Sequence, residues 1–473
     1  MGFIPLILII VDILIILVLI PTIILQRRES GATFAWILTI ILLPYIGLLL
    51  FWIFGTKKLH IKRRKRHQVE SKISSSILDF KNKKIKNLSL KEIPHSLINL
   101  ATKLDEAGPL RGNKVKLYRS GVNTFNDIEE AILSSINHIH FVYYIWEKDK
   151  TGQRIINALI QACERGVEVR VLVDGLGSYS TNNKFFEKLI NSGGIVERFF
   201  PINILGRHFN LNYRNHRKII IIDGHTGFTG GMNIGDDYAG IGQPWLDLHA
   251  RIRGSAVASL QEVFCQDWFH VTGQDLTHPK YFTQVENIGN TWVQVLSSGP
   301  ADERWKNIHT LLFASINSAE KNIWIETPYF IPDSAIIMAL QTAALKGVDV
   351  RLLLPSKSDH RLVLHAGRSF LMELMYAGVR VFEVQNAMPH AKMVTIDSHF
   401  SSLGSANMDQ RSFRLNFETN VFFYGKNVAK KLETDFTKAC KKEAIEIFLK
   451  DRKSIGLYQK LAEGIGRVFA PLL

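Results

Sequence analysis

The sequence carries one set of reactive residue types twice, at identical spacing. The first copy consists of His216, Lys218, Asp223, Gly230 and Asn233, and the second copy consists of His390, Lys392, Asp397, Gly404 and Asn407. A His and a Lys two residues apart would be a weak signal by themselves. Two complete copies of HxKxxxxD followed by GxxN are a specific signal, and they indicate one site to which each copy contributes half.

The chemistry follows from these side chains. Residues two apart in a strand point to one side, so the His and Lys of each copy share the same space. A Gly-x-x-Asn turn brings an amide and backbone N–H groups back to that space. Two imidazoles, two ammoniums and two amides suit a tetrahedral phosphoryl group. The cations and amides would hold its oxygens, one His would attack phosphorus, and the other would supply a proton to the leaving oxygen.

A metal site is the rival interpretation of paired histidines. The Lys beside each His would repel a cation, and no cluster of Asp or Glu surrounds either His in the sequence. The chain's three cysteines, Cys163, Cys265 and Cys440, stand far apart, which excludes a disulfide scaffold and a cysteine-rich zinc site. We therefore expect a reaction that uses no metal and no cofactor.

The motifs lie in a chain that repeats itself as alternating strands and helices. Residues 166–173 are echoed by residues 347–354, and each stretch has the pattern of a helix end followed by a buried strand. The alternation predicts an α/β fold with mixed sheets flanked by helices. Since 473 residues are too many for one hydrophobic core, the duplication predicts two similar halves, residues 111–287 and 288–473.

Two apolar runs precede these halves. Residues 3–25 contain one charge, Asp12, and residues 33–54 contain none. Each run is long enough to cross a hydrocarbon core of about 30 Å, so residues 1–56 are predicted to form a hairpin of two transmembrane helices. The first run lacks the basic start and the cleavage site of a signal peptide. Pro44 is expected to bend the second helix, or to mark where Tyr45 and Gly47 let the two helices approach. Asp12 is interpreted as a neutral side chain facing the partner helix.

Residues 57–110 are predicted to form a basic, partly amphipathic-helical linker. Residues 57–86 contain twelve Lys or Arg against Glu70 and Asp79, which accounts for most of the chain's formal net charge of +15. A basic stretch beside a membrane helix favours binding to anionic lipid headgroups over nucleic acid, and a pure topology signal is the plainer alternative. The basic excess after the second helix places the large C-terminal part on the cytoplasmic side.

The doubled motif resembles the phospholipase D superfamily. Residues 404–418 (GSANMDQRSFRLNFE), 215–218 (NHRK) and 326–332 (ETPYFIP) are similar to the bacterial cardiolipin synthases of that superfamily. The order of parts is similar as well: two membrane helices, a basic linker and two phospholipase-D-like halves. The resemblance covers nearly the whole chain and is weakest over residues 60–105. One departure is Gly231, where the second copy has Ser405.

The resemblance implies a role for each motif residue. His216 and His390 would be the catalytic pair, with His216 as the nucleophile and His390 as the acid and base, although the similarity of the halves leaves this order open. The residues that would bind the phosphate are Lys218, Lys392, Asn233 and Asn407. Asp223 and Asp397 would brace the motif through hydrogen bonds without touching phosphate.

Two downstream carboxylates, Asp247 and Glu418, would orient the imidazole rings by the same resemblance. A carboxylate at Nδ1 fixes the tautomer of a ring and raises its basicity. The alternative is that each carboxylate pairs with a surface arginine such as Arg251 or Arg414.

The implied activity is that of a membrane-bound phosphatidyl transferase. It would condense two phosphatidylglycerol molecules to cardiolipin and glycerol through a phosphatidyl-histidine intermediate at the bacterial plasma membrane. Its partners would be phosphatidylglycerol and anionic membrane lipids, with no nucleic acid; phosphatidylethanolamine as a donor and the oligomeric state are left open. The alternatives are a phospholipase D-type hydrolase of phospholipids and a phosphodiesterase or nuclease. A non-catalytic scaffold that binds anionic lipid through residues 57–86 represents another class of protein.

Overall fold

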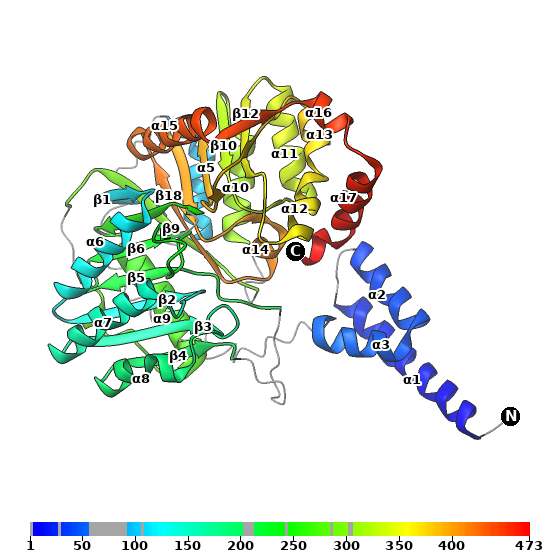
Figure 1. The fold of residues 1–473 in the computed structure, drawn as a ribbon, viewed down its shortest axis with the longest axis horizontal. Coiled ribbons are helices and arrows are strands. Elements are labelled where there is room, and N and C mark those ends of the chain that lie inside the picture. Colours follow the sequence, from blue (N-terminus) through cyan, green and yellow to red (C-terminus); the bar gives the residue numbers. More distant parts are fainter. Residues whose placement is uncertain are drawn as a thin grey trace. The chain divides into compact units, whose positions relative to one another are not determined.

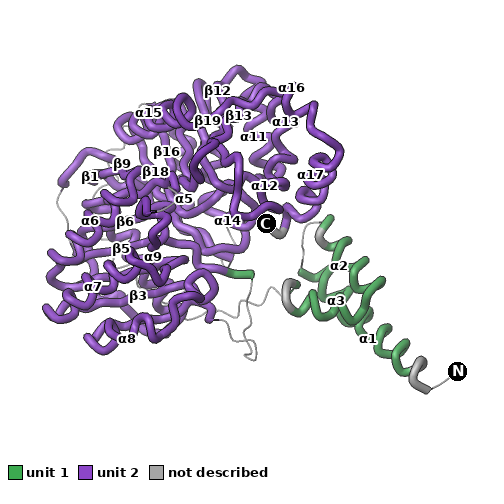
Figure 2. Tube along the Cα trace, viewed as in Figure 1, with its two compact units in different colours: residues 1–61, 202–213 green, residues 62–201, 214–473 purple. Residues whose placement is uncertain are grey.

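The computed structural model describes residues 3–26, 30–55, 92–105, 108–201, 212–241, 245–283, 287–300 and 306–473 (Figure 1). The chain divides into two compact units, residues 1–61 with 202–213 and residues 62–201 with 214–473 (Figure 2). The basic stretch predicted to bind lipid, residues 57–86, lies outside the described residues.

The first unit is built from the two apolar runs. Helix α1 spans Phe3–Leu25, and its segment Ile7–Leu25, with a mean hydropathy of 3.2, is long and apolar enough to cross a membrane. Among the described residues it is the one helix with that length and composition. Most of its apolar side chains face outward; Leu17, for example, is 63% exposed. A continuous apolar surface of this kind suits a lipid surrounding.

The second apolar run does not form the single helix predicted over residues 33–54. It is divided into α2 (Ser30–Leu42), α3 (Pro44–Leu50) and a π-helical turn (Phe51–Gly55). Pro44 has no N–H to donate back along a helix, and Leu43 leaves the helical conformation with φ −139° and ψ 69°. A Cβ on Gly47 would lie 3.0 Å from the Cα of Ile40, so α3 folds back against α2. The proline therefore ends the helix, where the prediction was a bend or a close approach of the two predicted helices.

One mixed sheet organises the second unit. Within the described residues it has 15 strands, in the order β19-β13-β12-β10-β15-β16-β18-β9-β1-β8-β6-β5-β2-β3-β4. The strands of the first half are β1 (Leu110–Tyr118), β2 (His138–Tyr143), β3 (Glu168–Asp174), β4 (Ile195–Phe199), β5 (Ile219–Ile222), β6 (Thr226–Gly230) and β8 (His249–Arg253). The strands of the second half are β9 (Thr291–Ser298), β10 (Asn322–Glu326), β12 (Asp349–Pro355), β13 (Arg380–Val384), β15 (Met393–Ile396), β16 (Phe400–Gly404), β18 (Glu418–Tyr424) and β19 (Ala444–Ile447).

The two halves repeat one strand order outward from a seam between β1 and β9. The order β1-β8-β6-β5-β2-β3-β4 corresponds to β9-β18-β16-β15-β10-β12-β13, and β1 pairs antiparallel with β9. In each half β2-β3-β4 or β10-β12-β13 are parallel, and the motif strands beside them are antiparallel. The mixed α/β fold agrees with the prediction. The fusion of both halves into one sheet was not predicted, because no sequence pattern marks the pairing at the seam.

Helices cover both faces of this sheet (Figure 1). The helices packed against the strands of the first half are α6 (Gly121–Leu133), α7 (Lys150–Glu164) and α8 (Asn183–Asn191) on one face and α9 (Val257–Thr272) on the other. Those of the second half are α10 (Asn307–Asn317), α11 (Ser334–Leu345), α12 (Arg361–Arg368) and α13 (Leu371–Tyr376) on one face and α15 (Lys426–Lys442) on the other. The apolar strands are therefore buried on both sides, which fixes their register.

Short elements complete the second unit. The additional helices are α5 (His95–Leu104), η3 (Pro279–Tyr281), α14 (Gln410–Arg414), α16 (Leu449–Lys453), α17 (Leu457–Phe469) and η4 (Ala470–Leu472). The additional strand pairs are β7 (Trp245–Leu246) with β14 (Met388–Pro389) and β11 (Phe330–Ile331) with β17 (Met408–Asp409). Both pairs lie next to motif residues, and β7-β14 joins the first half to the second.

Candidate active site

His216 lies just before strand β5, where the chain touches the other half. Asn215 and Phe417 form an isolated parallel bridge, and the N–H of His216 donates to the Phe417 carbonyl at 2.9 Å. The next residue, Glu418, begins β18 and holds its Oε2 3.1 Å from His216 Nδ1. The Ser405 carbonyl oxygen lies 3.0 Å from the same nitrogen. Two acceptors at Nδ1 favour the tautomer that carries its proton there, which leaves a lone pair on Nε2.

His390 is positioned in the same way from the opposite side. The β7-β14 pairing brings its N–H within 2.7 Å of the Leu246 carbonyl, to which it donates. The residue after Leu246 is Asp247, whose Oδ2 lies 2.7 Å from His390 Nδ1. The backbone contact and the carboxylate again come from the half that does not contain the His.

The two His–carboxylate pairs are therefore crossed. Asp247 and Glu418 are the carboxylates predicted to orient the rings, and the structure places Glu418 against His216 and Asp247 against His390. The surface arginines considered as alternative partners lie beside other carboxylates. Because both contacts cross the seam, neither half has a complete pair by itself.

Lys218 and Lys392 supply the positive charge, and both are buried. Each Nζ donates to the carbonyl of the His two residues before it, at 2.7 Å for Lys218 and 2.5 Å for Lys392. Burial, followed by the charge of Lys392, lowers the pKa of Lys218 to about 7, and burial lowers the pKa of Lys392 to about 8. Two buried ammonium groups that repel each other gain most from a shared anion, so this arrangement favours a negatively charged substrate.

Both imidazoles have lowered pKa values. Burial is the largest cause for each, and for His390 the nearby charges of Lys392 and Lys218 lower the pKa further. The rings are therefore neutral at neutral pH when no substrate is bound. An anion beside the two lysines would offset their charge, which makes His390 easier to protonate in a substrate complex than in the free protein.

The two carboxylates differ in their surroundings. Burial alone would raise the pKa of Glu418, but His216 beside it and the Ser405 hydroxyl, which donates at 2.5 Å, lower that pKa. Burial raises the pKa of Asp247 to about 6. Gly231 stands where the other half has Ser405, and a Cβ at Gly231 would overlap the Asp247 carboxylate. The one departure from the repeated motif therefore makes room for Asp247 and also removes its hydroxyl donor.

Asp223 and Asp397 lie at the opposite ends of the motif strands from the histidines. Each adopts a left-handed backbone conformation, with φ of 51° and 52°. The Asp223 carboxylate accepts hydrogen bonds from the N–H groups of residues 136–138, and the Asp397 carboxylate from those of residues 320–322, all at 2.7 to 3.0 Å. Both side chains tie a motif turn to the start of the neighbouring strand, which is the bracing geometry that the resemblance implied.

Asn233 and Asn407 are both buried in the loops that follow the motif strands. Asn233 donates through Nδ2 to the Tyr238 hydroxyl at 2.6 Å and accepts at 3.3 Å from the N–H of Ile145. The Oδ1 of Asn407 is buried without a hydrogen-bond partner among the described residues. A phosphate contact by either amide remains a proposal.

Aromatic side chains that were not predicted to belong to the site surround the imidazoles. The ring of Tyr144 lies edge-on to His216 with centroids 4.8 Å apart, and Lys218 Nζ lies 5.3 Å from the same tyrosine ring. Trp245 and Tyr238 lie 4.9 Å and 5.4 Å from the His390 ring. Trp245 stands two residues before Asp247 in the sequence, and this closeness to a predicted site residue is the one signal that could have indicated it. These rings place aromatic surface against both imidazoles.

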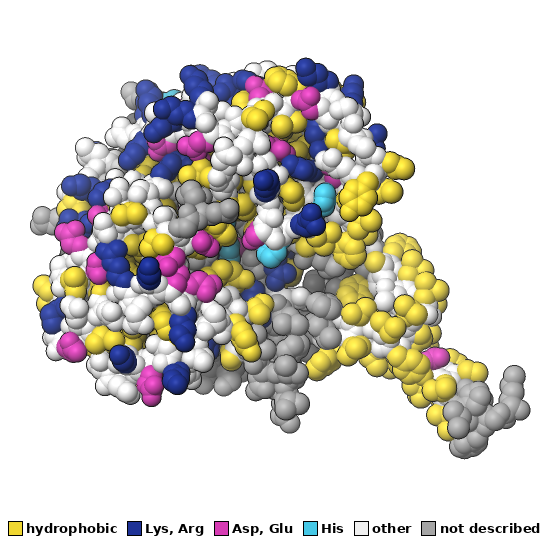
Figure 3. All heavy atoms as spheres, in the orientation of Figure 1, with side chains coloured by type: hydrophobic (Ala, Val, Ile, Leu, Met, Phe, Trp, Pro, Cys, Tyr) yellow, Lys and Arg dark blue, Asp and Glu magenta, His cyan; other side chains and the backbone are white. Residues whose placement is uncertain are grey.

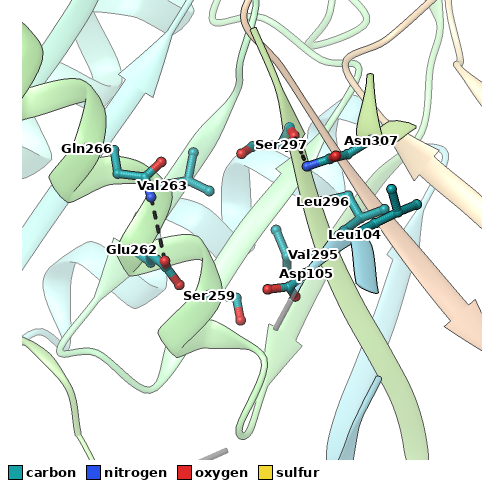
Figure 4. Close-up of a pocket in the computed structure, with 10 residues that line it drawn as sticks. All are labelled: Leu104, Asp105, Ser259, Glu262, Val263, Gln266, Val295, Leu296, Ser297 and Asn307. Atoms are coloured by element: carbon teal, nitrogen blue, oxygen red, sulfur yellow. Dashed lines mark hydrogen bonds between the residues drawn. The ribbon is translucent and has the colours of Figure 1, made fainter. Parts of the chain in front are cut away.

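Other polar groupings lie apart from the paired motifs. A cavity of about 180 Å³ opens between the end of α5, helix α9 and strand β9 (Figure 4). In it Gln266 donates to Glu262 at 3.5 Å and Asn307 donates to the Ser297 carbonyl at 3.4 Å. None of its lining residues belongs to either motif copy. Over the described ranges, no group of three or more His, Cys, Asp or Glu side chains is arranged to hold a metal ion.

Two α/β halves that bring one HxKxxxxD motif each to a common site define a phospholipase-D-like protein. Comparison with known proteins places the chain more narrowly. The family described as "Cardiolipin synthase, PLD-like domain" matches residues 128–268 and 312–440, and the one described as "Phospholipase_D-nuclease N-terminal" matches residues 6–55. The chain belongs to the bacterial cardiolipin synthase family of the phospholipase D superfamily.

Whole-chain relatives agree with this assignment, and a solved structure shares the fold. The chain is 38% identical to "Cardiolipin synthase 2" of Bacillus anthracis over 461 residues, covering 95% of this chain and 88% of that protein. It is 36% identical to "Cardiolipin synthase" of Listeria welshimeri over 490 residues, covering 100% of both. The fold is similar to that of phosphatidylserine synthase of Haemophilus influenzae, with a TM-score of 0.63 at 15% identity over 80% of this chain and 100% of that one.

Proposed function

We propose that the chain condenses two phosphatidylglycerol molecules into cardiolipin and glycerol. The observation that carries this proposal is the crossed arrangement of the site, in which each half supplies a His and a Lys and completes the other half's His–carboxylate pair. Such a site is assembled for one phosphodiester. The names of the full-length relatives support the choice of phosphatidyl groups as the substrate class.

In the first step His216 attacks the phosphorus of one phosphatidylglycerol through Nε2. A bond forms between Nε2 and phosphorus, and the bond between phosphorus and the headgroup glycerol oxygen breaks. His390, which takes up a proton when the substrate anion binds beside the two lysines, gives that proton to the oxygen, so glycerol leaves neutral. The Glu418 carboxylate stabilises the positive charge that develops on the His216 ring, and the result is a phosphatidyl-histidine intermediate.

In the second step the headgroup hydroxyl of another phosphatidylglycerol takes the place of glycerol. His390 now accepts the hydroxyl proton, the oxygen attacks phosphorus, and the bond to Nε2 of His216 breaks. Cardiolipin is released and both rings return to their starting state. One phosphodiester is exchanged for another, so the scheme needs no nucleotide, metal or cofactor.

The remaining site residues stabilise and position the reacting group. Lys218 and Lys392, with the amides of Asn233 and Asn407, would hold the non-bridging oxygens as negative charge develops. Asp223 and Asp397 keep the motif turns in place through their hydrogen bonds to the start of the neighbouring strand. The aromatic rings beside the imidazoles would help to keep water away from the intermediate, because hydrolysis of that intermediate would yield phosphatidic acid instead of cardiolipin.

We further propose that the first unit anchors the enzyme in the plasma membrane as a helical hairpin. Helix α1 is the full span, and α2 with α3 packs against it. The second unit would have residues 111–287 and 288–473 as its two halves. The basic residues of 57–86 would keep it on the cytoplasmic side. The same residues would concentrate phosphatidylglycerol and other anionic lipids at the site.

The product mixture from phosphatidylglycerol vesicles tests the proposed reaction. The reconstituted enzyme is expected to form cardiolipin and glycerol in equal amounts. Phosphatidic acid with glycerol would instead identify a phospholipase D-type hydrolase. Cleavage of DNA without any lipid turnover would identify a nuclease and contradict the lipid assignment.

A further inference from the structure

Helix α17 carries its apolar residues on the outside of the protein. The side chains that are 56% to 85% exposed are Leu457, Tyr458, Leu461, Ile465 and Val468. The residues that the helix buries are Glu463 and Gly466. A surface helix of a globular protein normally turns its apolar stripe toward the core, so this helix has the reverse arrangement.

The inward face of α17 is held by close and specific contacts. Glu463 accepts a hydrogen bond from Arg452 of α16 at 2.6 Å, and both side chains are buried. A Cβ on Gly466 would lie 2.8 Å from the Cα of Ala366 in α12, so the two helices touch through their backbones. The outward direction of the apolar stripe is therefore built into the packing of the helix.

Basic residues accompany the apolar stripe. The exposed cations of α16 and α17 are Lys450, Lys453, Lys460 and Arg467, of which Arg467 pairs with Glu373 of α13 at 2.7 Å. The acidic residues of the same two helices are engaged, since Asp451 accepts from the Phe448 N–H at 2.9 Å and Glu463 is paired with Arg452. Figure 3 shows hydrophobic side chains gathered over α17, with Lys and Arg beside them. The exposed surface thus combines aliphatic side chains, a tyrosine and positive charge.

We propose that this face of α17 lies in the interface of an anionic lipid bilayer. Aliphatic side chains would enter the boundary between headgroups and acyl chains to a depth of about 5–10 Å, as in other interfacial amphipathic helices. Tyr458 suits the headgroup level, and the lysines suit the lipid phosphates. The charge favours this occupant over a second copy of the chain, whose own α17 would present the same positive charge.

The contact of α17 with lipid would also position the second half-site relative to the membrane. The η4 turn follows α17, and the Leu473 carbonyl accepts from the N–H of Arg411 at 3.1 Å. Arg411 lies in α14, a few residues after Asn407, so the interfacial helix is joined to the loop of the second half-site. This purpose rests on the proposed function, whereas the lipid contact itself does not.

The test uses the full-length chain with Cys163, the partly exposed native cysteine, replaced by serine. A probe cysteine at Val468 carries an environment-sensitive fluorophore such as NBD. The matched control is a probe at Ile136, which is equally exposed (78% against 76%) and lies where β2 begins, at the opposite end of that strand from His216. Both proteins are reconstituted into phosphatidylglycerol vesicles with and without lipids brominated on their acyl chains.

We expect blue-shifted emission and strong quenching by brominated lipid at position 468, and neither at position 136. Emission at 468 that stays water-like would overturn the proposal. A blue shift without quenching would overturn it too, because protein would then cover the face. Cardiolipin formation is measured on the same samples, so quenching without cardiolipin would refute the proposed function and leave the lipid contact standing.

A functional variant provides a second test. Leu461→Glu with Val468→Glu is expected to lower the rate on phosphatidylglycerol vesicles about tenfold, because a charged face no longer enters the interface. The rate on a short-chain, monomeric phosphatidylglycerol should stay unchanged. Equal rates of variant and parent on vesicles would contradict the inference.

Discussion

Replacing Glu418 with Gln removes one negative charge from the site and keeps the shape of the side chain. Glu418 contacts His216 Nδ1 at 3.1 Å, and the Ser405 carbonyl lies 3.0 Å from that nitrogen and can still accept its proton in the variant. The variant therefore keeps the reactive tautomer. What it loses is the carboxylate that stabilises the cationic ring once His216 has attacked phosphorus.

The size of the loss follows from this geometry. Opposite unit charges about 4 Å apart interact by about 4 kcal/mol at the effective dielectric constant of about 20 that fits protein sites. Losing that interaction in the transition state lowers kcat by about three powers of ten, while the Michaelis constant changes little because the free ring is neutral. We expect Glu418→Gln to form cardiolipin about a thousandfold more slowly than the parent.

The assay is the initial rate of cardiolipin formation in phosphatidylglycerol vesicles. Glu383→Gln is the matched control, since Glu383 is also a buried glutamate. It pairs with Arg368 at a distance of 3.1 Å, and neither residue belongs to a motif. It should lose stability and keep its kcat. A Glu418→Gln enzyme within about tenfold of the parent, at equal amounts of folded protein, would refute the crossed pairing as a catalytic feature.

Three further predictions follow from the same contacts. The pKa of Asp247 lies near 6, above its ordinary value of 3.8, so the buried carboxylate costs stability, and this loss grows as the pH rises between these two values and is complete above them. Asp247→Asn should therefore abolish most activity yet gain up to about 3 kcal/mol in the free energy of unfolding at pH 8, and nothing below pH 4, in thermal unfolding across pH. Gly231→Ser should displace the Asp247 carboxylate and lower both melting temperature and kcat, whereas Gly464→Ala, where a Cβ meets nothing within 4 Å, should cost no stability. Asp397→Ala should lower the free energy of unfolding by about 2–4 kcal/mol through the loss of three backbone hydrogen bonds, with Asp397→Asn closer to the parent in the same unfolding measurement.

The motif residues could be identified from sequence because strand periodicity acts over a few residues. The two-residue spacing of His216 and Lys218, repeated at His390 and Lys392, requires only that each stretch be extended. The duplication then requires two similar halves. Both inferences rest on local geometry, which a single sequence contains.

The crossed pairing could not be obtained in that way. Glu418 lies 202 residues after His216, and Asp247 lies 143 residues before His390, so their contacts depend on how the halves meet. That meeting is set by the β1-β9 seam, which buries ordinary strand residues without any distinctive pattern. The need for Gly231 also became evident only once the Asp247 carboxylate was seen to occupy the space of a Cβ.

The second apolar run was mispredicted as one helix for a different reason. Composition alone treats residues 33–54 as one continuous apolar helix. Pro44 was expected to bend that helix or to mark a close approach of the two predicted helices, whereas a proline can also end a helix. In the structure the missing N–H of Pro44 combines with the small Gly47, which lets α3 approach Ile40 closely. A proline followed three residues later by a glycine permits the chain to reverse its direction, and a hydropathy profile contains no information about such a reversal.

The central claim is that two half-sites act on one phosphorus atom, and trapping the covalent adduct tests it most directly. Full-length enzyme is incubated with phosphatidylglycerol labelled in its phosphate, quenched, and mapped for the labelled residue in the His216→Ala and His390→Ala variants. We predict adduct on His216 in His390→Ala, formed more slowly because the proton donor for the leaving glycerol is missing. We predict no adduct in His216→Ala and no cardiolipin from either variant. Adduct on both histidines in the parent, with each single variant keeping about half of the activity, would show two independent sites and contradict the account.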